Sequence, residues 1–381
     1  MKKSTKIFAA LSMVALAVIS IGCQEWVEPE ALVFERSLTE SSHGDGSGTY
    51  YKNLRAYKAG KKHTVSFGWF SDWTGVGTDA GGKLMGMPDS LDIVSMWGNW
   101  HSLSPEKKED LRKVQEIKGT RVMMCFIIAN IGDQTTPQSV RNDWIVDGVQ
   151  YDSEAEALAA FWGWYGNYGD TSEEGIEKAC RKYARSILDT IAKYNWDGFD
   201  FDLEPGYGSP GNIASYKQNI DYVIDEMSKE LGPASGTRKL LCVDGQPYSI
   251  SAESAQKLDY FILQAYYDTH YSSTDGRVNT MLNAFGDIMS KEEILSKIIL
   301  TSDFESCAKQ GGTRGDGSAY TARDGSKIPQ IYGYATYRHP DVDARIGGFG
   351  AYRFGFDYSN GHDYRYIRNA IQLANPALEV K

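Results

Sequence analysis

The stretch Asp197-Gly198-Phe199-Asp200-Phe201-Asp202-Leu203-Glu204 decides how this chain folds. Its acidic and apolar side chains alternate from residue 199 onward, which is the pattern of a β-strand. Successive side chains of a strand point to opposite faces, so Asp200, Asp202 and Glu204 share one face and the three apolar residues share the other. The apolar face would pack under helices, and the acidic face must then point into the interior of a barrel.

This strand is one of eight short apolar runs, and amphipathic helical stretches such as 173–193 and 213–231 lie between the runs. Eight strands that alternate with helices predict an α/β fold, the (β/α)8 or TIM barrel, with long loops at 133–170 and 305–343. A doubly wound sheet is the alternative, but no glycine-rich phosphate-binding turn joins the first strand to a helix. The predicted strands cover residues 64–70, 91–97, 121–128, 198–203, 239–243, 260–266, 298–301 and 346–352.

Composition narrows the class of protein further. The chain has 381 residues, of which 41% are hydrophobic and 24% charged, values typical of a globular protein and not of a disordered, fibrous or multi-span membrane protein. Its formal net charge is −10, and no basic block follows the first residues, which argues against nucleic acid as a partner. Aromatic residues make up 12% of the chain, which indicates either an aromatic core or a surface for flat-faced ligands such as sugars.

The N-terminal residues are typical of an export signal. Lysines precede an apolar run that is short for a membrane span, and the run ends Ser20-Ile21-Gly22-Cys23. This ending resembles the bacterial lipobox, with Ser20 in place of the usual leucine, so Cys23 is the predicted lipidation site; an ordinary cleaved signal is the alternative. The acidic residues that follow resemble the surface-export signal of Bacteroides-type lipoproteins. We therefore expect a secreted lipoprotein of the outer membrane, with a signal peptide over 1–22, a linker over 23–60 and the barrel domain over 61–381.

Three carboxyl groups stacked inside a barrel cannot all ionise cheaply, so the pKa of at least one should rise. A carboxyl with a raised pKa beside an ionised one suits the protonation of a leaving-group oxygen, as in glycoside hydrolysis. Glu204 ends the strand, where the substrate of a barrel enzyme sits, and Asp202 and Asp200 lie successively deeper. A metal site is the competing use, but carboxylates on one strand form a column rather than a cage, and no histidine follows at ligand spacing. We therefore expect neither a metal nor a cofactor.

Four cysteines remain after removal of the signal peptide: Cys125, Cys180, Cys242 and Cys307. Two of them lie within apolar runs and one within a helical stretch, and none shows a CxxC or zinc-site spacing. We expect mostly buried thiols, with a disulfide neither excluded nor indicated.

The octapeptide at 197–204 resembles the DGxDxDxE signature of glycoside hydrolase family 18 and lies on the predicted fourth strand, as in that family. The sixth strand ends at 263–268, where Tyr266 matches the family's tyrosine and Gln264 resembles the Gln-x-Tyr of its endoglycosidase branch. The resemblance implies that Glu204 acts as general acid and then as base, while the substrate's own 2-acetamido group is the nucleophile. It also implies that Asp202 stabilises the resulting oxazolinium ion, that Asp200 shares a proton with Asp202, and that Tyr266 donates its hydroxyl to the acetamido oxygen.

Three departures from typical chitinases favour the endo-β-N-acetylglucosaminidases, which cleave between the two core N-acetylglucosamine residues of N-glycans. The eighth strand has no tryptophan, the third lacks SxGG, and the sixth has Gln264 where chitinases carry methionine. A chitinase and a surface glycan-binding protein of the same fold are the alternatives, although such binding proteins usually lose the acid and Glu204 is intact. The implied partner is an N-linked glycan or glycoprotein, bound by a monomer.

Aromatic side chains at the strand ends and in the long loops are candidates for sugar contacts, and we expect some of the tryptophans to pack loops onto the barrel instead. The predicted substrate-binding residues are Trp69, Trp97, Trp100, Trp144, Trp162, Trp164 and Tyr352.

Overall fold

The computed structural model describes residues 48–60, 63–206, 211–313, 319–361 and 363–376. The predicted signal peptide, Cys23 and most of the predicted linker lie outside the described residues. Within the described ranges, no helix is both long enough and apolar enough to cross a membrane. The compact unit that carries the barrel spans Tyr51–Lys381.

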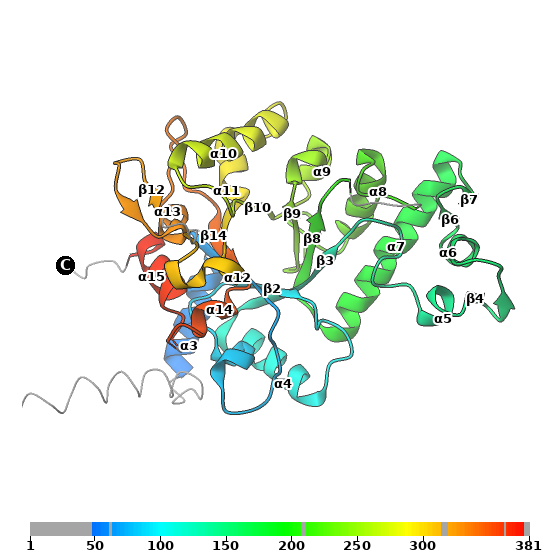
Figure 1. The fold of residues 1–381 in the computed structure, drawn as a ribbon, viewed down its shortest axis with the longest axis horizontal. Helices are drawn as coiled ribbons and strands as arrows, with labels where there is room; N and C mark the ends of the chain where they lie inside the picture. The colour runs from blue at the N-terminus through cyan, green and yellow to red at the C-terminus, as the bar shows by residue number, and fades with distance from the viewer. Residues whose placement is uncertain (1–47, 61–62, 207–210, 314–318, 362, 377–381) are drawn as a thin grey trace, which may run out of the picture. The chain divides into compact units, whose positions relative to one another are not determined.

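Eight parallel strands close into a barrel, which confirms the predicted (β/α)8 fold (Figure 1). Neighbouring strands around the barrel follow the order β1-β2-β3-β8-β9-β10-β11-β14 and return to β1. Each strand overlaps one of the eight predicted runs. The strands are β1 (Val65–Phe70), β2 (Ile93–Trp97), β3 (Arg121–Ile127), β8 (Gly198–Leu203), β9 (Leu240–Gly245), β10 (Tyr260–Gln264), β11 (Ile298–Asp303) and β14 (Gly348–Tyr352).

The longest helix, α7 (Glu173–Tyr194), shows how local sequence sets the helix ends. The Ser172 side chain accepts from the Gly175 amide and caps the first turn, while Asn195 adopts φ 58° and ends the helix. The predicted helix over 213–231 is shorter than expected, because α8 covers only Lys217–Met227. The other helices around the strands are α4 (Pro105–Lys113), α9 (Ala252–Ala255), α10 (Tyr271–Phe285), α11 (Lys291–Lys297), α14 (Gly355–Tyr358) and α15 (Arg365–Ala374).

The alternation of side chains along β8 separates an outer core from the barrel interior. Phe199, Phe201 and Leu203 are fully buried in the outer core, between the strands and the helices, as predicted. Asp200 and Asp202 point the other way and are also buried. Burial of each large apolar side chain contributes roughly 1.5–3 kcal/mol, which helps to offset the cost of enclosing two carboxyl groups.

Helix α3 (Gly48–Ala59) corrects the predicted domain boundary, because residues from Tyr51 onward belong to the compact unit rather than to the linker. Tyr51 is buried, and Lys58 Nζ donates to Leu91 O and to Thr120 Oγ1, both at 2.7 Å. These partners precede β2 and β3, so this helix packs at the N-terminal end of the barrel. That end is opposite the one at which barrel enzymes build their sites.

The two long loops predicted from the sequence carry secondary structure of their own. The loop after β3 contains α5 (Gln138–Arg141), β4 (Ile145–Val146), β5 (Val149–Gln150), α6 (Glu154–Trp162), β6 (Trp164–Tyr165) and β7 (Tyr168–Gly169). The loop after β11 contains α12 (Phe304–Cys307), β12 (Tyr320–Thr321), β13 (Lys327–Ile328) and α13 (Gln330–Ala335).

Candidate active site

Asp200 lies in the middle of β8 and is fully buried. Trp69 Nε1 and Ser95 Oγ donate to its Oδ2 atom at 3.1 and 2.7 Å. Burial raises the pKa of the Asp200 carboxyl to about 6, and hydrogen bonds from Ser95 and Trp69 act in the opposite direction. The barrel therefore supports a negative charge on Asp200 in spite of its burial.

Asp202 lies one pleat closer to the C-terminal end of β8 and is 3% exposed. Burial raises the pKa of its carboxyl to about 7, and the charges of Glu204 and Asp200 add to that rise. The prediction that the pKa of at least one carboxyl on this strand is raised is thus confirmed. Gln264, the last residue of β10, points its Nε2 atom at Asp202 Oδ1 across 3.5 Å.

A further buried carboxyl, which the sequence reasoning missed, belongs to Asp244 on β9, directly opposite Asp202 in the strand register. Gln264 Nε2 donates to Asp244 Oδ1 at 2.8 Å, and Cys125 Sγ donates to Oδ2 at 3.7 Å. A carboxyl oxygen of Asp244 lies within 4.8 Å of a carboxyl oxygen of Asp200. Burial, followed by the charges of Asp202 and Asp200, raises its pKa well above the usual range.

Asp200, Asp202 and Asp244 form what we call the carboxylate column. Glu204, the Tyr266 hydroxyl and two further aromatic rings lie at its opening. Glu204 follows the last residue of β8 and is partly exposed. The rings of Tyr266 and Tyr352 lie 5.9 Å apart, and Trp97 meets Tyr352 edge-on at 6.1 Å. All three rings are partly exposed. Burial raises the pKa of the Tyr266 hydroxyl well above its usual range, so this group stays protonated and can donate.

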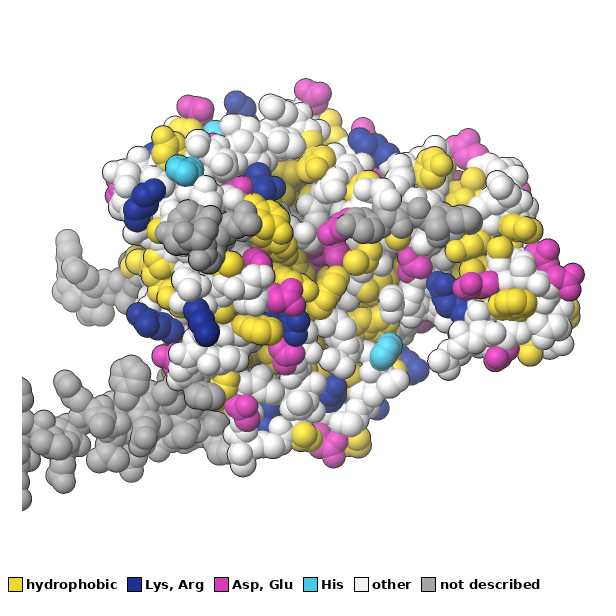
Figure 2. Space-filling view, in the orientation of Figure 1, with side chains coloured by type: hydrophobic (Ala, Val, Ile, Leu, Met, Phe, Trp, Pro, Cys, Tyr) yellow, Lys and Arg dark blue, Asp and Glu magenta, His cyan; other side chains and the backbone are white. Residues whose placement is uncertain are grey.

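Figure 2 shows hydrophobic side chains gathered along a hollowed band in the middle of the visible face, with acidic side chains at its edge. Trp144 is 37% exposed on the loop after β3 and can still offer a ring face to a sugar.

Four of the predicted sugar-binding tryptophans are buried, and this burial contradicts a role as open platforms for sugar rings. Trp69, Trp100, Trp162 and Trp164 expose 1, 4, 2 and 6% of their surface. Trp69 instead lies in the barrel interior and donates to Asp200.

The other three buried tryptophans pack loops, which was the alternative role expected for some of them. Trp100 stacks on Phe126 with ring centroids 5.3 Å apart. Trp162 Nε1 donates to Thr136 Oγ1 at 2.9 Å, and Trp164 Nε1 donates to a backbone carbonyl within its own turn.

The four described cysteines are buried and no disulfide joins them, which confirms the expectation of buried thiols. Cys125 Sγ and carboxyl oxygens of Asp200 and Asp244 lie within 4.8 Å of one another. A thiol must lose its proton to bind a metal ion, but burial and the nearby carboxylates raise the pKa of Cys125 well above its usual range. These three residues therefore do not fit a metal ion.

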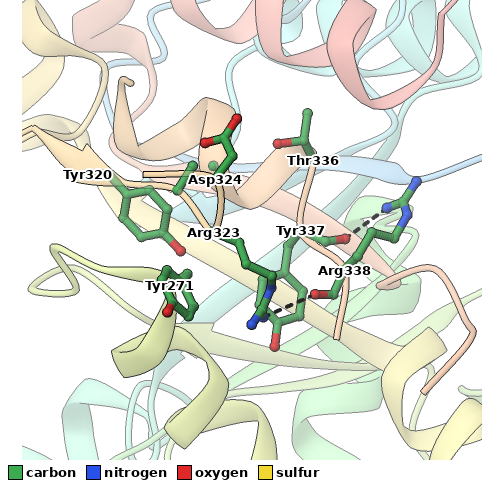
Figure 3. A pocket seen from close by; sticks show the side chains of 9 residues that line it. Tyr271, Tyr320, Arg323, Asp324, Thr336, Tyr337 and Arg338 are labelled. Carbon is green, nitrogen blue, oxygen red and sulfur yellow. Dashed lines mark hydrogen bonds between the residues drawn. The ribbon is translucent and has the colours of Figure 1, made fainter. Parts of the chain in front are cut away.

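A second hollow, of about 280 Å³, lies between the start of α10 and the loop after β11, as Figure 3 shows. Arg323 lies over the Tyr271 ring at 4.6 Å and pairs with Asp275 at 2.8 Å. The residues that line this hollow include none of the carboxylate column, so it is separate from the candidate active site.

The column combines two buried carboxyls, whose pKa values are raised to about 6 and about 7, with a partly exposed carboxyl at the opening. Such a pairing can protonate a leaving-group oxygen and stabilise positive charge on a sugar. The chemistry available is therefore acid–base and electrostatic.

Comparisons with known proteins agree with this arrangement. The family model described as glycoside hydrolase family 18, BT1044-like, matches residues 27–373. The solved structure of a glutamate-to-glutamine variant of BT1044 is 32% identical with a TM-score of 0.71, and the match covers 89% of this chain and 96% of that one.

Two structures of an endo-β-N-acetylglucosaminidase from Cordyceps militaris share the fold. The apo form is 21% identical with a TM-score of 0.55, and a double variant in complex with fucosyl-N-acetylglucosamine-Asn is 19% identical with a TM-score of 0.54. Each match covers 88% of this chain and 99% of the other. No curated protein matches the chain.

Proposed function

The chain belongs to glycoside hydrolase family 18, and from that premise we propose that it is an endo-β-N-acetylglucosaminidase that cleaves the β-1,4 bond between the two core N-acetylglucosamine residues of N-glycans. The substrate is the glycan of a glycoprotein or glycopeptide. Hydrolysis is substrate-assisted and retains the anomeric configuration. One N-acetylglucosamine stays on the protein, and the rest of the glycan leaves.

In the proposed mechanism, Glu204 protonates the glycosidic oxygen while the acetamido carbonyl oxygen of the sugar attacks the anomeric carbon. Asp202 accepts a hydrogen bond from the acetamido N–H and stabilises the positive oxazolinium ion. Tyr266 donates its hydroxyl to the acetamido oxygen and orients it for attack. Glu204, now ionised, then deprotonates the water that opens the oxazolinium ion.

The observation that carries this proposal is the group formed by Asp202, Gln264 and Tyr266 next to Glu204. Gln264 points its amide at Asp202, and the nearby Tyr266 hydroxyl stays protonated, so the group offers both a carboxylate and a neutral donor. An acetamido group has one N–H donor and one carbonyl acceptor, which match these two partners. Trp97 and Tyr352 give the opening partly exposed ring faces against which sugars pack.

We further propose that the protein is anchored in the outer membrane through a lipid on Cys23. The support is the sequence around Cys23, where a short apolar run and small residues precede a cysteine. An anchored enzyme of this kind would act on glycoproteins outside the cell.

The test is incubation of the purified protein with high-mannose, hybrid and complex glycoproteins, with chitin oligomers in parallel. We expect a mass loss of one glycan per site, with one N-acetylglucosamine left on the protein, and no turnover by the Glu204→Gln variant. Release of N,N′-diacetylchitobiose from chitin with intact glycoproteins would show a chitinase instead. Binding of glycans without turnover would show a glycan-binding protein.

A further inference from the structure

A third hollow, of about 470 Å³, lies at the N-terminal end of the barrel, opposite the candidate active site. Its walls come from α3 and from the segments that lead into β3, β8 and β9. Its volume falls within the range of roughly 300–1,000 Å³ that is usual for small-molecule sites. The charged side chains that line it are Arg55, Lys58, Arg121, Arg238 and Asp197.

The arginines of this hollow have no acidic partner. Within the described residues, no ion pair joins Arg55, Arg121 or Arg238 to a carboxylate. Arg181 and Arg185 on α7, in contrast, each pair with more than one carboxylate. The chain has 50 acidic and 40 basic residues, so a shortage of acidic side chains does not explain the difference. Three unpaired positive charges around one hollow therefore indicate a site for an anion.

The surroundings hold two of the guanidinium groups and leave most of their N–H groups open. Arg55 Nη1 donates to Ile117 O at 2.8 Å, and Arg121 Nη1 makes a longer contact of 3.5 Å with Arg238 O. The stem of Arg55 packs against Gly119, where a Cβ atom would lie 2.9 Å from Arg55 Cγ. Each guanidinium has five N–H donors, so a ligand in the hollow can accept from several of them.

The acidic side chain that lines the hollow is engaged by other groups. Asp197 Oδ2 accepts from Val122 N and from Gln115 Nε2, both at 2.8 Å. Lys58 donates to two neutral oxygens, and burial lowers its pKa to about 7 although the charge of Asp92 opposes the fall. An anion in the hollow would favour the charged form of this lysine.

We propose that this hollow binds a phosphate monoester through Arg55, Arg121 and Arg238. A phosphate monoester carries a charge of roughly −1.5 to −2 at pH 7 and three acceptor oxygens, so it can accept from more than one guanidinium at once. The planar fork of an arginine also matches the geometry of phosphate oxygens. The site lies at the end of the barrel opposite Glu204, so its ligand is not the glycosidic bond that is cleaved, and the proposal does not depend on the hydrolytic function.

Two sources offer this group, a phospholipid headgroup and a soluble phosphate ester. Helix α3, which carries Arg55 and Lys58, is the first described helix after Cys23, the predicted lipidation site. The lipid source is therefore tested beside the soluble one, with glycerol 3-phosphate and phosphatidic acid as probes that present the same headgroup.

The first test is isothermal titration calorimetry of the full chain with glycerol 3-phosphate at constant ionic strength. We expect Arg121→Gln and Arg238→Gln each to weaken binding by about tenfold, because each removes a hydrogen-bonded charge. Arg238 makes no side-chain hydrogen bond within the described residues, so Arg238→Gln should keep the wild-type melting temperature.

The matched control for these variants is Arg338→Gln. Arg338 is exposed at the hollow beside α10, and it too has no carboxylate partner within the described ranges. The control changes the net charge equally and should keep the wild-type affinity. An equal loss in the control would show that the net charge of the protein attracts the ligand, and it would overturn the site.

The second test is sedimentation with phosphatidylcholine vesicles, with and without phosphatidic acid. All variants carry Cys23→Ala, so that no lipid on the protein contributes to binding. Binding to phosphatidic acid that Arg121→Gln weakens and Arg338→Gln does not would identify a lipid headgroup, whereas binding of glycerol 3-phosphate alone would identify a soluble ester. Failure of both probes to bind would overturn the proposal. Glycan release is a separate readout, since Arg121→Gln should keep the wild-type kcat and a wild type without glycan release would refute only the proposed function.

Discussion

Replacement of Trp69 by phenylalanine distinguishes a role of this side chain as a sugar platform from its role as a hydrogen-bond donor to Asp200. The change keeps an aromatic ring in the barrel interior but removes the indole N–H that donates to Asp200 Oδ2 at 3.1 Å. A hydrogen bond to a charged group is worth about 1.5–3 kcal/mol. The contact is the longer of the two that reach this oxygen, the other being Ser95 at 2.7 Å, so we take the lower end of that range.

At about 1.4 kcal/mol per pKa unit, the loss should raise the pKa of Asp200 by roughly one unit, from its present value of about 6. A protonated Asp200 cannot take up a further proton, so Asp202 no longer ionises. The acid limb of kcat should therefore move up by roughly one pH unit, which corresponds to about a fivefold loss of kcat at pH 6 and about a tenfold loss at lower pH. KM for the glycan should stay the same, because Trp69 is 1% exposed and does not reach the substrate.

The assay is the pH dependence of kcat and KM on one glycopeptide for wild type and Trp69→Phe. Phe67→Leu is the matched control, because Phe67 packs edge-on against Trp69 at 4.7 Å but donates no hydrogen bond. It should lower the melting temperature without moving the acid limb. A severalfold rise in KM with an unmoved acid limb would refute the reasoning and restore Trp69 as a sugar platform.

Three other expectations concern Glu204, the buried carboxyls of β8 and Cys23. Glu204→Gln should lower kcat by about 10²–10⁴-fold or more while glycan binding and the melting temperature persist, and near-normal turnover would remove Glu204 from the mechanism. Because folding raises the pKa values of Asp200 and Asp202 from 3.8 to about 6 and about 7, the folded protein binds more protons than the unfolded one between pH 4 and 7. The free energy of unfolding should therefore fall as the pH rises through that window, and calorimetry of Asp200→Asn should show a smaller fall. Cys23→Ala should move the protein from the membrane fraction to the soluble fraction without changing kcat, and retention in the membrane would contradict lipidation.

The barrel could be predicted because each of its strands can be identified from the residues of that strand alone. Each strand is a short apolar run, and on β8 the alternation of acidic and apolar residues also indicates which face is enclosed. The depth order of Asp200, Asp202 and Glu204 follows from the same alternation, since a strand that ends at residue 203 leaves Glu204 at the opening.

Asp244 was missed because it looks like part of a turn. Gly245 and a proline at 247 follow it, and both residue types are typical of turns, so the predicted strand ends at residue 243. Extension of the alternation from Leu240 and Cys242 by one more pleat would have placed Asp244 on the inward face. Its contact with Asp202 depends on the register between β8 and β9, which single-strand patterns do not contain.

The aromatic residues were misassigned for a related reason. A tryptophan at a strand end has the same local sequence whether its ring faces sugar or a neighbouring loop, and only the packing of distant segments decides between the two. Trp162, for example, is enclosed by Thr136 and Tyr183 from other parts of the chain. Helix α3 was missed because a glycine- and serine-rich stretch precedes it and its side-chain hydrogen bonds reach residues 33 and 62 positions further along.

The claim that the substrate supplies its own nucleophile is tested most directly by the reaction of Asp202→Asn with a preformed sugar oxazoline. The variant lacks the charge that stabilises the oxazolinium ion, a contribution on the order of 3–4 kcal/mol, so it should form that ion slowly from a glycan. An oxazoline bypasses the slow step. Mass spectrometry of the variant with oxazoline and an N-acetylglucosamine acceptor should therefore show the joined product accumulating, with little hydrolysis of it. Failure to use the oxazoline any faster than the intact glycan would contradict the substrate-assisted account.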